Sequence, residues 1–220
     1  MCKDQDKELL KSFLNRTFFR DFKDNKIEAP HSKLFNNLEF QLNSKCNLNC
    51  IYCYYNHTKG FGKGLNPSSI SKDDNLRDNS SAILKYLTDN GMYPQRIDIF
   101  GGEPLNQSIT YEIIDKVIEF YSNGNQKGRI SIPTNMSFLR NEKLMNKVIY
   151  YKQKAKDNNV HLGISASVDG KYMDVDNRPV IKAKNQETFY NDEFYDKLFS
   201  FARDYGCGFH PMIHYNNIEK

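Results

Sequence analysis

The 220-residue sequence lacks several features that would place it in common classes of protein. It has no tryptophan, and no apolar run approaches the roughly 20 residues that a membrane-spanning helix needs. The charged start of the chain, Met1 to Asp6, carries no apolar signal-peptide segment. These absences predict a cytoplasmic protein that has no membrane partner.

The charge balance also argues against a nucleic-acid partner. The formal net charge is only +4, and the lysines are dispersed along the chain. No helix-turn-helix, RNA-binding or zinc-finger pattern accompanies them, so we expect no nucleic-acid partner. Hydrophobic residues make up 39% of the chain and aromatic residues 13%, which is enough to build a folded core.

Cysteine is scarce, but three of the five cysteines form a tight C-x3-C-x2-C run, which consists of Cys46, Cys50 and Cys53. No second cysteine cluster matches it, and in a reducing compartment such a run binds metal more often than it forms disulfides. Three thiolates can hold three corners of a cubane iron–sulfur cluster and leave the fourth iron open to a ligand that is not protein. A structural zinc site is the alternative, and it requires a fourth ligand from elsewhere in the chain, such as His57, Cys207 or His210.

The order of the elements predicts an α/β fold. Residues 6–22 have the apolar spacing of an amphipathic helix, a polar linker runs to residue 31, and a core domain follows over 32–220. Residues 56–80 are rich in Asn, Gly and Ser and predict a long loop. The expected strands are 34–42, 96–100, 129–132, 160–168 and 207–213, and the expected helices are 80–90, 108–122, 141–158 and 192–205.

Strands that alternate with helices pair in parallel, so we expect an open, curved sheet of about five strands and not a closed eight-stranded barrel. The last helix is predicted to pack through an apolar stripe that includes Phe194 and Phe199. No covering helix follows the last strand, so we expect the core domain to be incomplete at Lys220 and the natural protein to continue.

Conspicuous polar motifs follow three of these strands. Gly101-Gly102-Glu103-Pro104 follows the second strand, Asn135 follows the third, and Ser167-Val168-Asp169-Gly170 ends the fourth. Ligands of open α/β sheets bind at the carboxyl ends of the strands, so these motifs are expected to meet. Asn135 has an alternative interpretation as a turn residue that caps a helix. Asp174-x-Asp176 is similar to part of a calcium-binding loop, but the required Gly and distal Glu are missing.

In this order, the cysteine run with Tyr52 before its last cysteine, the GGEP motif and the Ser-x-Asp-Gly motif resemble the radical S-adenosylmethionine (radical SAM) superfamily. The similarity is to its peptide-modifying, anaerobic sulfatase-maturase-like (SPASM-type) branch, truncated before the auxiliary-cluster domain. The resemblance implies a partial (β/α)6-type barrel and two cofactors, a 4Fe-4S cluster and S-adenosylmethionine. It also implies that one electron from the cluster cleaves S-adenosylmethionine to a 5′-deoxyadenosyl radical, which modifies a peptide or protein side chain.

The resemblance further implies an external electron donor such as a flavodoxin or ferredoxin, and sensitivity to oxygen. It makes Cys46, Cys50 and Cys53 the iron ligands. It places the following residues at S-adenosylmethionine: Tyr52, Gly101, Gly102, Glu103, Pro104, Asn135, Ser167 and Arg178. In this scheme the backbone near Tyr52 contacts the adenine, Glu103 accepts from the ammonium group and Arg178 binds the carboxylate.

The chain departs from the family pattern at three places. Phe100 stands before the glycines, where the family often has a polar residue, and Met136 stands where it usually has Gly. The spacing from Ser167 to Arg178 is a residue shorter than usual. The sequence names no catalytic side chain, no particular substrate and no bond formed. A non-catalytic or inactive, truncated module that binds zinc or an iron–sulfur cluster remains the alternative to an enzyme.

Overall fold

The computed structural model describes residues 36–53, 73–181 and 184–211, and within them it places five parallel strands in one sheet. The strands lie in sequence order, β1-β2-β3-β4-β5, and every neighbouring pair is parallel. Their bounds are β1 Asn37–Gln41, β2 Arg96–Phe100, β3 Gly128–Thr134, β4 Val160–Ala166 and β5 Gly208–Phe209. The predicted α/β class and open parallel sheet are therefore confirmed.

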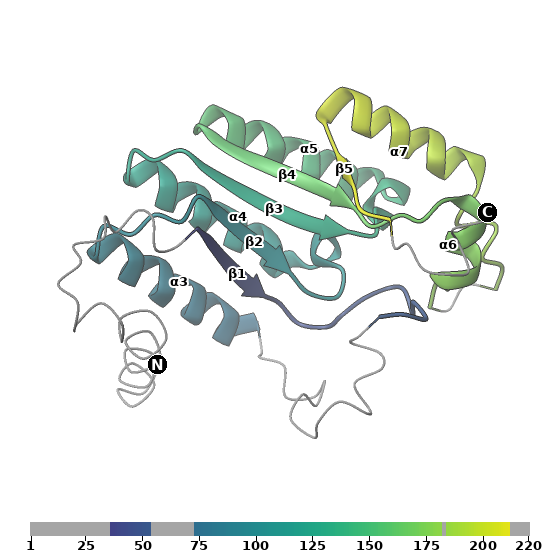
Figure 1. Cartoon of the computed structure of the whole chain (residues 1–220), viewed down its shortest axis with the longest axis horizontal. Coiled ribbons are helices and arrows are strands. Elements are labelled where there is room, and N and C mark those ends of the chain that lie inside the picture. The colour runs from purple at the N-terminus through teal and green to yellow at the C-terminus, as the bar shows by residue number, and fades with distance from the viewer. Residues whose placement is uncertain (1–35, 54–72, 182–183, 212–220) are drawn as a thin grey trace, which may run out of the picture.

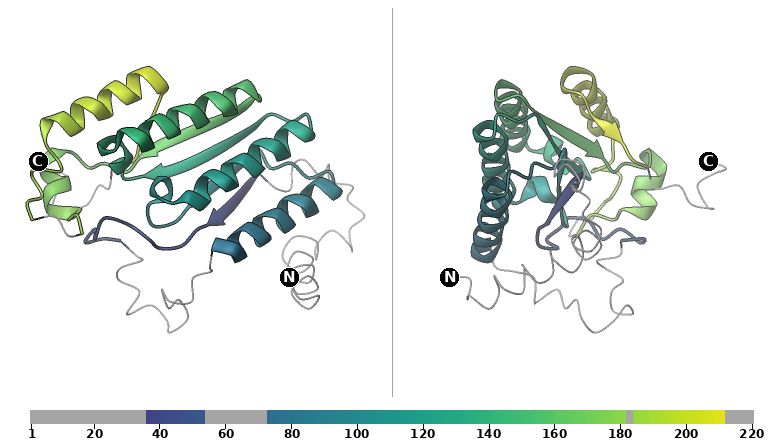
Figure 2. Two further views of the ribbon diagram at one scale, coloured as in Figure 1. Left: turned by 180° about the vertical axis from the view of Figure 1, so that it is seen from behind. Right: turned by 60° about the vertical axis from the view of Figure 1, so that its left-hand side comes forward.

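The helices lie between successive strands in the chain. Their bounds are α3 Asp73–Asp89, α4 Ser108–Asn123, α5 Glu142–Asp157, α6 Lys171–Asn177 and α7 Asp192–Tyr205, and two 3-10 turns lie at η3 Pro104–Asn106 and η4 Ser137–Arg140. Helices α3, α4 and α5 cover one face of the sheet, as the front and back views show (Figures 1 and 2). The opposite face of β1 to β4 carries no such helical layer in the described part of the chain. This is the arrangement of a barrel wall that does not close on itself.

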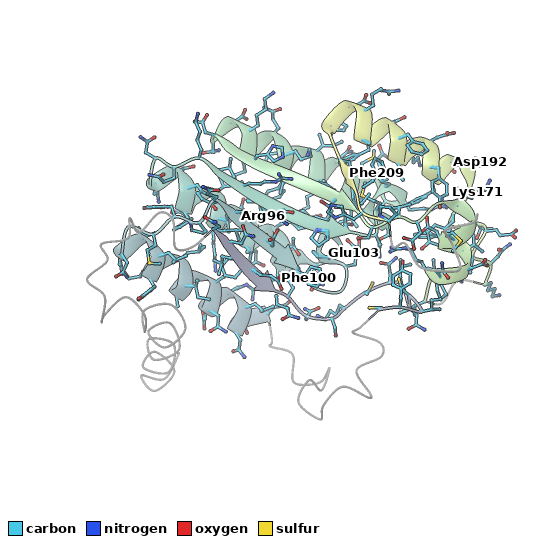
Figure 3. All side chains as sticks on the ribbon, viewed as in Figure 1. Arg96, Phe100, Glu103, Lys171, Asp192 and Phe209 are labelled. Carbon is cyan, nitrogen blue, oxygen red and sulfur yellow. The ribbon has the colours of Figure 1, made fainter. Side chains whose placement is uncertain are left out.

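The alternation along the strands explains which face is covered. In β2, Ile97 and Ile99 are fully buried, whereas Arg96, Asp98 and Phe100 are only partly buried. Successive side chains of a strand point to opposite faces, so the isoleucines pack under the helices and the other three residues lie on the open face. Figure 3 shows Arg96 and Phe100 at the two ends of β2. The main core thus lies between the sheet and α3, α4 and α5.

Helix α3 begins earlier than predicted, at Asp73, so residues 73–79 of the predicted loop are helical. Asp73 and Asp74 lie in its first turn, where carboxylates stabilise the positive end of the helix dipole. Arg77 donates to Glu112 on α4, with 2.9 Å between Nη2 and Oε1. Leu76, the one apolar residue of this polar stretch, packs against the core, and the ion pair with α4 adds a second contact to the first turns of α3.

Other boundaries also differ from the prediction. Helix α6 was not predicted, β4 ends at Ala166 and not at 168, and β5 has only two residues of the predicted 207–213. The predicted helix over 6–22, the linker to residue 31 and most of the loop over 56–80 lie outside the described residues. No helix in the described part of the chain is long and apolar enough to cross a membrane.

The predicted apolar stripe of α7 is wrong at one residue. Phe194 is fully buried, but Phe199 is 60% exposed and stacks on Phe209, with 6.4 Å between ring centroids. Because α7 lies near the two-residue strand β5, little of the sheet extends under this side of the helix. The helix buries Phe194, Leu198 and Phe201 instead.

This difference can be tested with two matched substitutions in α7. Phe194→Ala should lower the free energy of unfolding by roughly 3–5 kcal/mol, because it leaves a cavity in the core. Phe199→Ala removes the same atoms from an exposed position and should change it by no more than about 0.5 kcal/mol. Urea unfolding followed by circular dichroism measures both, and equal losses would contradict the burial assigned to α7.

Candidate functional site

The predicted site residues meet in one cavity of about 370 Å³ at the carboxyl ends of the strands. Segments after β1, β2, β3, β4 and β5 all contribute to it. The residues that line it are Ser44, Cys46, Leu48, Cys50, Tyr52, Cys53, Phe100, Gly101, Gly102, Glu103, Pro133, Thr134, Asn135, Ser167, Arg178, His210 and Pro211. Among the predicted site residues only Pro104 is absent from this lining; it is the buried first residue of η3.

The cysteine loop follows β1 and is held in place by backbone hydrogen bonds. Within the loop, the Cys53 amide donates to the Cys50 carbonyl at 3.1 Å. From outside, the segment that follows α6 pairs with it: Asn49 N donates to Pro179 O at 2.8 Å, and Ile51 N donates to Asn177 O at 2.9 Å. Two segments some 130 residues apart therefore fix where the three thiols lie.

The three thiols are partly buried, and burial makes the ionised forms of Cys46 and Cys50 costly. Burial raises the pKa of Cys46, and it raises the pKa of Cys50 to about 11. The nearby Arg178 guanidinium opposes the shift at Cys50, whereas the neighbouring cysteines add to it. A bound cation removes this penalty, because coordination deprotonates a thiol outright.

The donor set fits an iron–sulfur cluster better than a single metal ion. In the ranges that the structure describes, no three His, Cys, Asp or Glu side chains converge closely enough to hold one ion. A structural zinc site needs four ligands around one ion. In a cluster each thiolate can bind a different iron, so the thiolates need not converge on a point.

The two glycines of the GGEP motif let the turn after β2 lie directly on the backbone of the cysteine loop. A Cβ on Gly102 would come within 2.3 Å of the Lys45 carbonyl oxygen and 2.5 Å of that of Ser44, which no side chain can do. Gly102 N donates to Asn43 O at 3.0 Å, and Glu103 N donates to Lys45 O at 2.8 Å. The resemblance places both glycines at S-adenosylmethionine; the structure shows that they bring backbone close to backbone beside the cavity.

Glu103 is 1% exposed and accepts three hydrogen bonds within the protein. Its Oε1 accepts from the Thr134 hydroxyl at 2.6 Å and from Leu105 N at 3.3 Å, and its Oε2 accepts from Asn135 N at 2.7 Å. Burial raises the pKa of Glu103 to about 7, although these bonds oppose the shift. A carboxylate so placed gains stability when a cationic group enters the cavity.

Asn135 lines the cavity, and its side chain joins the turn after β3 to the cysteine loop. Its Oδ1 accepts from Ser137 N at 2.9 Å at the start of η4, and its Nδ2 donates to Asn47 Oδ1 in the cysteine loop at 3.0 Å. The next residue, Met136, has a left-handed backbone with φ 62° and is fully buried. This conformation favours Gly, which explains why Met136 is an unusual residue at this position; its buried side chain offsets the backbone strain.

Ser167 and Arg178 reach the cavity from the segments that follow β4. The Ser167 amide donates to Thr134 O at 2.8 Å and so continues the β3–β4 pairing beyond the strands. Arg178 is 5% exposed, and Asp169 binds it in a fork, at 2.9 Å from Nε and 3.1 Å from Nη2. The Arg178 guanidinium lies 5.2 Å from the centre of the Tyr52 ring.

Sequence reasoning missed the two carboxylates that hold Arg178. Asp169 forms the fork, and Asp174 lies 3.2 Å from Arg178 Nε, one helical turn before it. The i, i+4 spacing of Asp174 and Arg178 was a signal that could have predicted this pair. The partial similarity to a calcium loop is thereby explained, because Asp174 pairs with an arginine.

Together these features define a class of protein: a parallel α/β sheet with a cysteine loop and a polar cavity at its carboxyl end. A family described as a 4Fe-4S single cluster domain matches residues 40–188, and the chain belongs to that family. An uncharacterized protein of Methanocaldococcus jannaschii is 31% identical over 138 residues, which are 60% of this chain and 38% of that protein.

The fold is also that of a solved anaerobic sulfatase-maturating enzyme, anSMEcpe. Its histidine-tagged form with bound AdoMet matches with a TM-score of 0.50 and 21% identity, over 80% of this chain and 43% of that one. The native form with bound AdoMet and Cp18Cys peptide matches with a TM-score of 0.47 and 22% identity, over 80% and 42%. The chain thus spans about two fifths of the length of the proteins it matches.

The fold match confirms the predicted partial barrel, and the family match confirms the predicted 4Fe-4S class of protein. The family match supports the 4Fe-4S cluster as a cofactor of this chain, and AdoMet, or S-adenosylmethionine, is the ligand bound in the matched fold.

The raised pKa of Glu103 gives a test of the site in the ligand-free protein. The folded state holds the Glu103 proton up to about pH 7, whereas the unfolded chain releases it near its ordinary value of 4.5. The folded state therefore binds more protons between these values, and stability must fall as the pH rises from about 4.5 to about 7. Glu103→Gln cannot ionise and should lack this slope, a difference of roughly 3 kcal/mol across the window.

Urea unfolding of both proteins at several pH values measures the difference. Glu142→Gln is a suitable control, because Glu142 lies exposed in the first turn of α5 and should leave the wild-type slope unchanged. Parallel pH profiles for wild type and Glu103→Gln would show that burial does not raise the pKa of Glu103.

Proposed function

We propose that this chain is the core of a radical SAM enzyme that modifies a peptide or protein side chain. One observation carries the proposal: a single cavity gathers the three cysteines together with a buried carboxylate and a serine. A cluster that only transfers electrons does not require neighbouring polar side chains that can bind an amino acid. Such groups suit a cofactor that presents an ammonium and a carboxylate to the open iron.

The residues present fit both absent groups. Cys46, Cys50 and Cys53 would hold three irons of a 4Fe-4S cluster, and the partly buried loop shields the cluster from water. Glu103 would accept from the ammonium of S-adenosylmethionine, which offsets the cost of burying that carboxylate. Ser167 offers a hydroxyl at the ribose or carboxylate end, and Tyr52 lines the same cavity.

When both groups are bound, they supply a 5′-deoxyadenosyl radical by one-electron reductive cleavage of S-adenosylmethionine. This chain's residues hold the reacting groups in place and keep bulk water away from them. Phe100 and Pro133 line the cavity on the side of the open sheet face and give it an apolar wall next to the polar one. An apolar wall offers a reactive intermediate no polar hydrogen-bonding partner and limits side reactions.

A peptide or protein substrate is the proposed target. The supporting observations are the fold shared with an enzyme named for sulfatase maturation and the open face of the sheet, which no described α-helix covers in the views of Figures 1 and 2. That face presents Arg96 and Asp98, which form an ion pair at 2.7 Å, next to Phe100 at the cavity. A surface of this mixed character suits a chain with both polar and apolar groups. The electron would come from an external donor such as a flavodoxin or ferredoxin.

The first test is anaerobic reconstitution of the full chain with iron and sulfide. The reduced cluster should give an electron paramagnetic resonance signal that changes when S-adenosylmethionine is added, because the cofactor binds the open iron. 5′-Deoxyadenosine should then form and be detected by chromatography. A cluster whose signal ignores S-adenosylmethionine would point to a non-catalytic module and contradict the enzyme.

The second test concerns the ligands. Cys50→Ala should abolish cluster assembly and 5′-deoxyadenosine formation, with iron content and absorbance as readouts. Cys207→Ala is the matched control, because Cys207 precedes β5 and does not line the cavity, so its cluster should be normal. Full iron content in the Cys50 variant, or loss of the cluster in the Cys207 variant, would refute the assignment.

A further inference from the structure

A buried network of charged and phenolic groups lies beside the cysteine loop. Asp169 is fully buried, and it accepts the Tyr52 hydroxyl as well as the fork from Arg178. Asp174 accepts the Tyr195 hydroxyl at 2.6 Å and the amides of Asp169 and Gly170 at 3.0 and 3.2 Å. Each carboxylate is thus held by several donors, and the single guanidinium lies between the two.

The network fixes Arg178 in place at one side of the cavity. The Arg178 carbonyl accepts the Tyr190 hydroxyl at 2.9 Å, and the Arg178 amide donates to Asp174 O at 3.0 Å. Backbone and side chain are therefore both anchored, and the planar guanidinium has little freedom to swing toward a ligand. Its Nε and Nη2 donors are already committed to carboxylates.

Arg178 is also close to a cluster ligand. Its guanidinium lies over the ring of Tyr52, which is two residues after Cys50, and Arg178 lines the same cavity as the three cysteines. Asp169 and Asp174 do not line that cavity. Among the cavity-lining residues that the structure describes, Arg178 is the single side chain with a permanent positive charge.

We propose that Arg178, fixed by Asp169 and Asp174 as positioning residues, sets the reduction potential of the cluster that the cysteine loop holds. This inference rests on the proposed function, since it needs a cluster at Cys46, Cys50 and Cys53. A fixed cation next to one thiolate stabilises the reduced cluster, which is more negative, and so raises its potential. The carboxylates act from further away and in the opposite direction.

The test is a redox titration of the reconstituted full chain, with the reduced cluster followed by electron paramagnetic resonance. The double variant Asp169→Asn with Arg178→Gln removes both charges of the fork and leaves a polar amide at each position, and its midpoint potential should fall below that of the wild type. Asp169→Asn alone keeps Arg178 and removes a negative charge, so its midpoint should rise. Opposite shifts of this kind are not expected from structural damage alone.

Lys171→Gln is the matched control. Lys171 is the first residue of α6, the helix that ends just before Arg178, and it pairs with a carboxylate, Asp192 at 2.6 Å, but both side chains are exposed and neither lines the cavity (Figure 3). Its midpoint should equal that of the wild type. Unchanged or same-sign shifts in the two network variants, or an equal shift in the Lys171 variant, would overturn the inference.

Two further outcomes keep the test decisive. The single variant Arg178→Lys keeps the positive charge but not the forked hydrogen bonds. Its midpoint potential should lie well above that of the double variant and close to that of the wild type. A midpoint as low as that of the double variant would overturn the role of the charge.

Absence of a cluster in the wild type would overturn the proposed function and this inference with it. A normal wild-type cluster with unshifted variants overturns this inference alone.

Discussion

The contact on which the site depends is the packing of the Gly101–Gly102 turn against the backbone of the cysteine loop. It joins the ends of β1 and β2 through two backbone hydrogen bonds, to Asn43 O and Lys45 O, and leaves no room for a side chain. Everything that faces the cavity is placed relative to this junction. Glu103 follows it immediately, and the cysteine loop begins from it. Because the contact is between backbones, substitutions elsewhere in the chain cannot make room for a Cβ atom at either glycine.

Strand and helix order could be read from the sequence because the buried parts of the chain have clear periodicity. β2 and α7 have the predicted bounds, α4 differs from prediction by one residue at its end, and α5 differs by one residue at each end, since apolar residues alternate or recur there at regular spacing. The start of α3 could not be read, because its first two turns carry a single apolar residue, Leu76, which packs against the core. The exposure of Phe199 depends on how little of β5 lies beneath it.

In the cavity, too, some features could be predicted from the local sequence, whereas others depend on contacts between distant segments. The motifs stand at the ends of strands, and the parallel order of the sheet brings them together, so their meeting could be predicted. The hydrogen-bond partners of the individual side chains could not be predicted. The fork between Asp169 and Arg178 arises from how α6 turns back toward the cysteine loop, and α6 itself was not predicted. The backbone at Met136, with its positive φ, likewise has no signal in the residue type that occupies it.

The backbone hydrogen bonds that hold the cysteine loop have a consequence for how the metal enters the protein. Small zinc domains acquire their fold only when the ion arrives, because the ligands are themselves the core. Here the hydrophobic core lies under α3, α4 and α5, on the other side of the sheet from the open face, and the loop is held on both sides by backbone pairing. We therefore expect the polypeptide to fold first and to receive its inorganic centre afterwards, so that a cell short of iron would accumulate a folded, empty protein that can be loaded later.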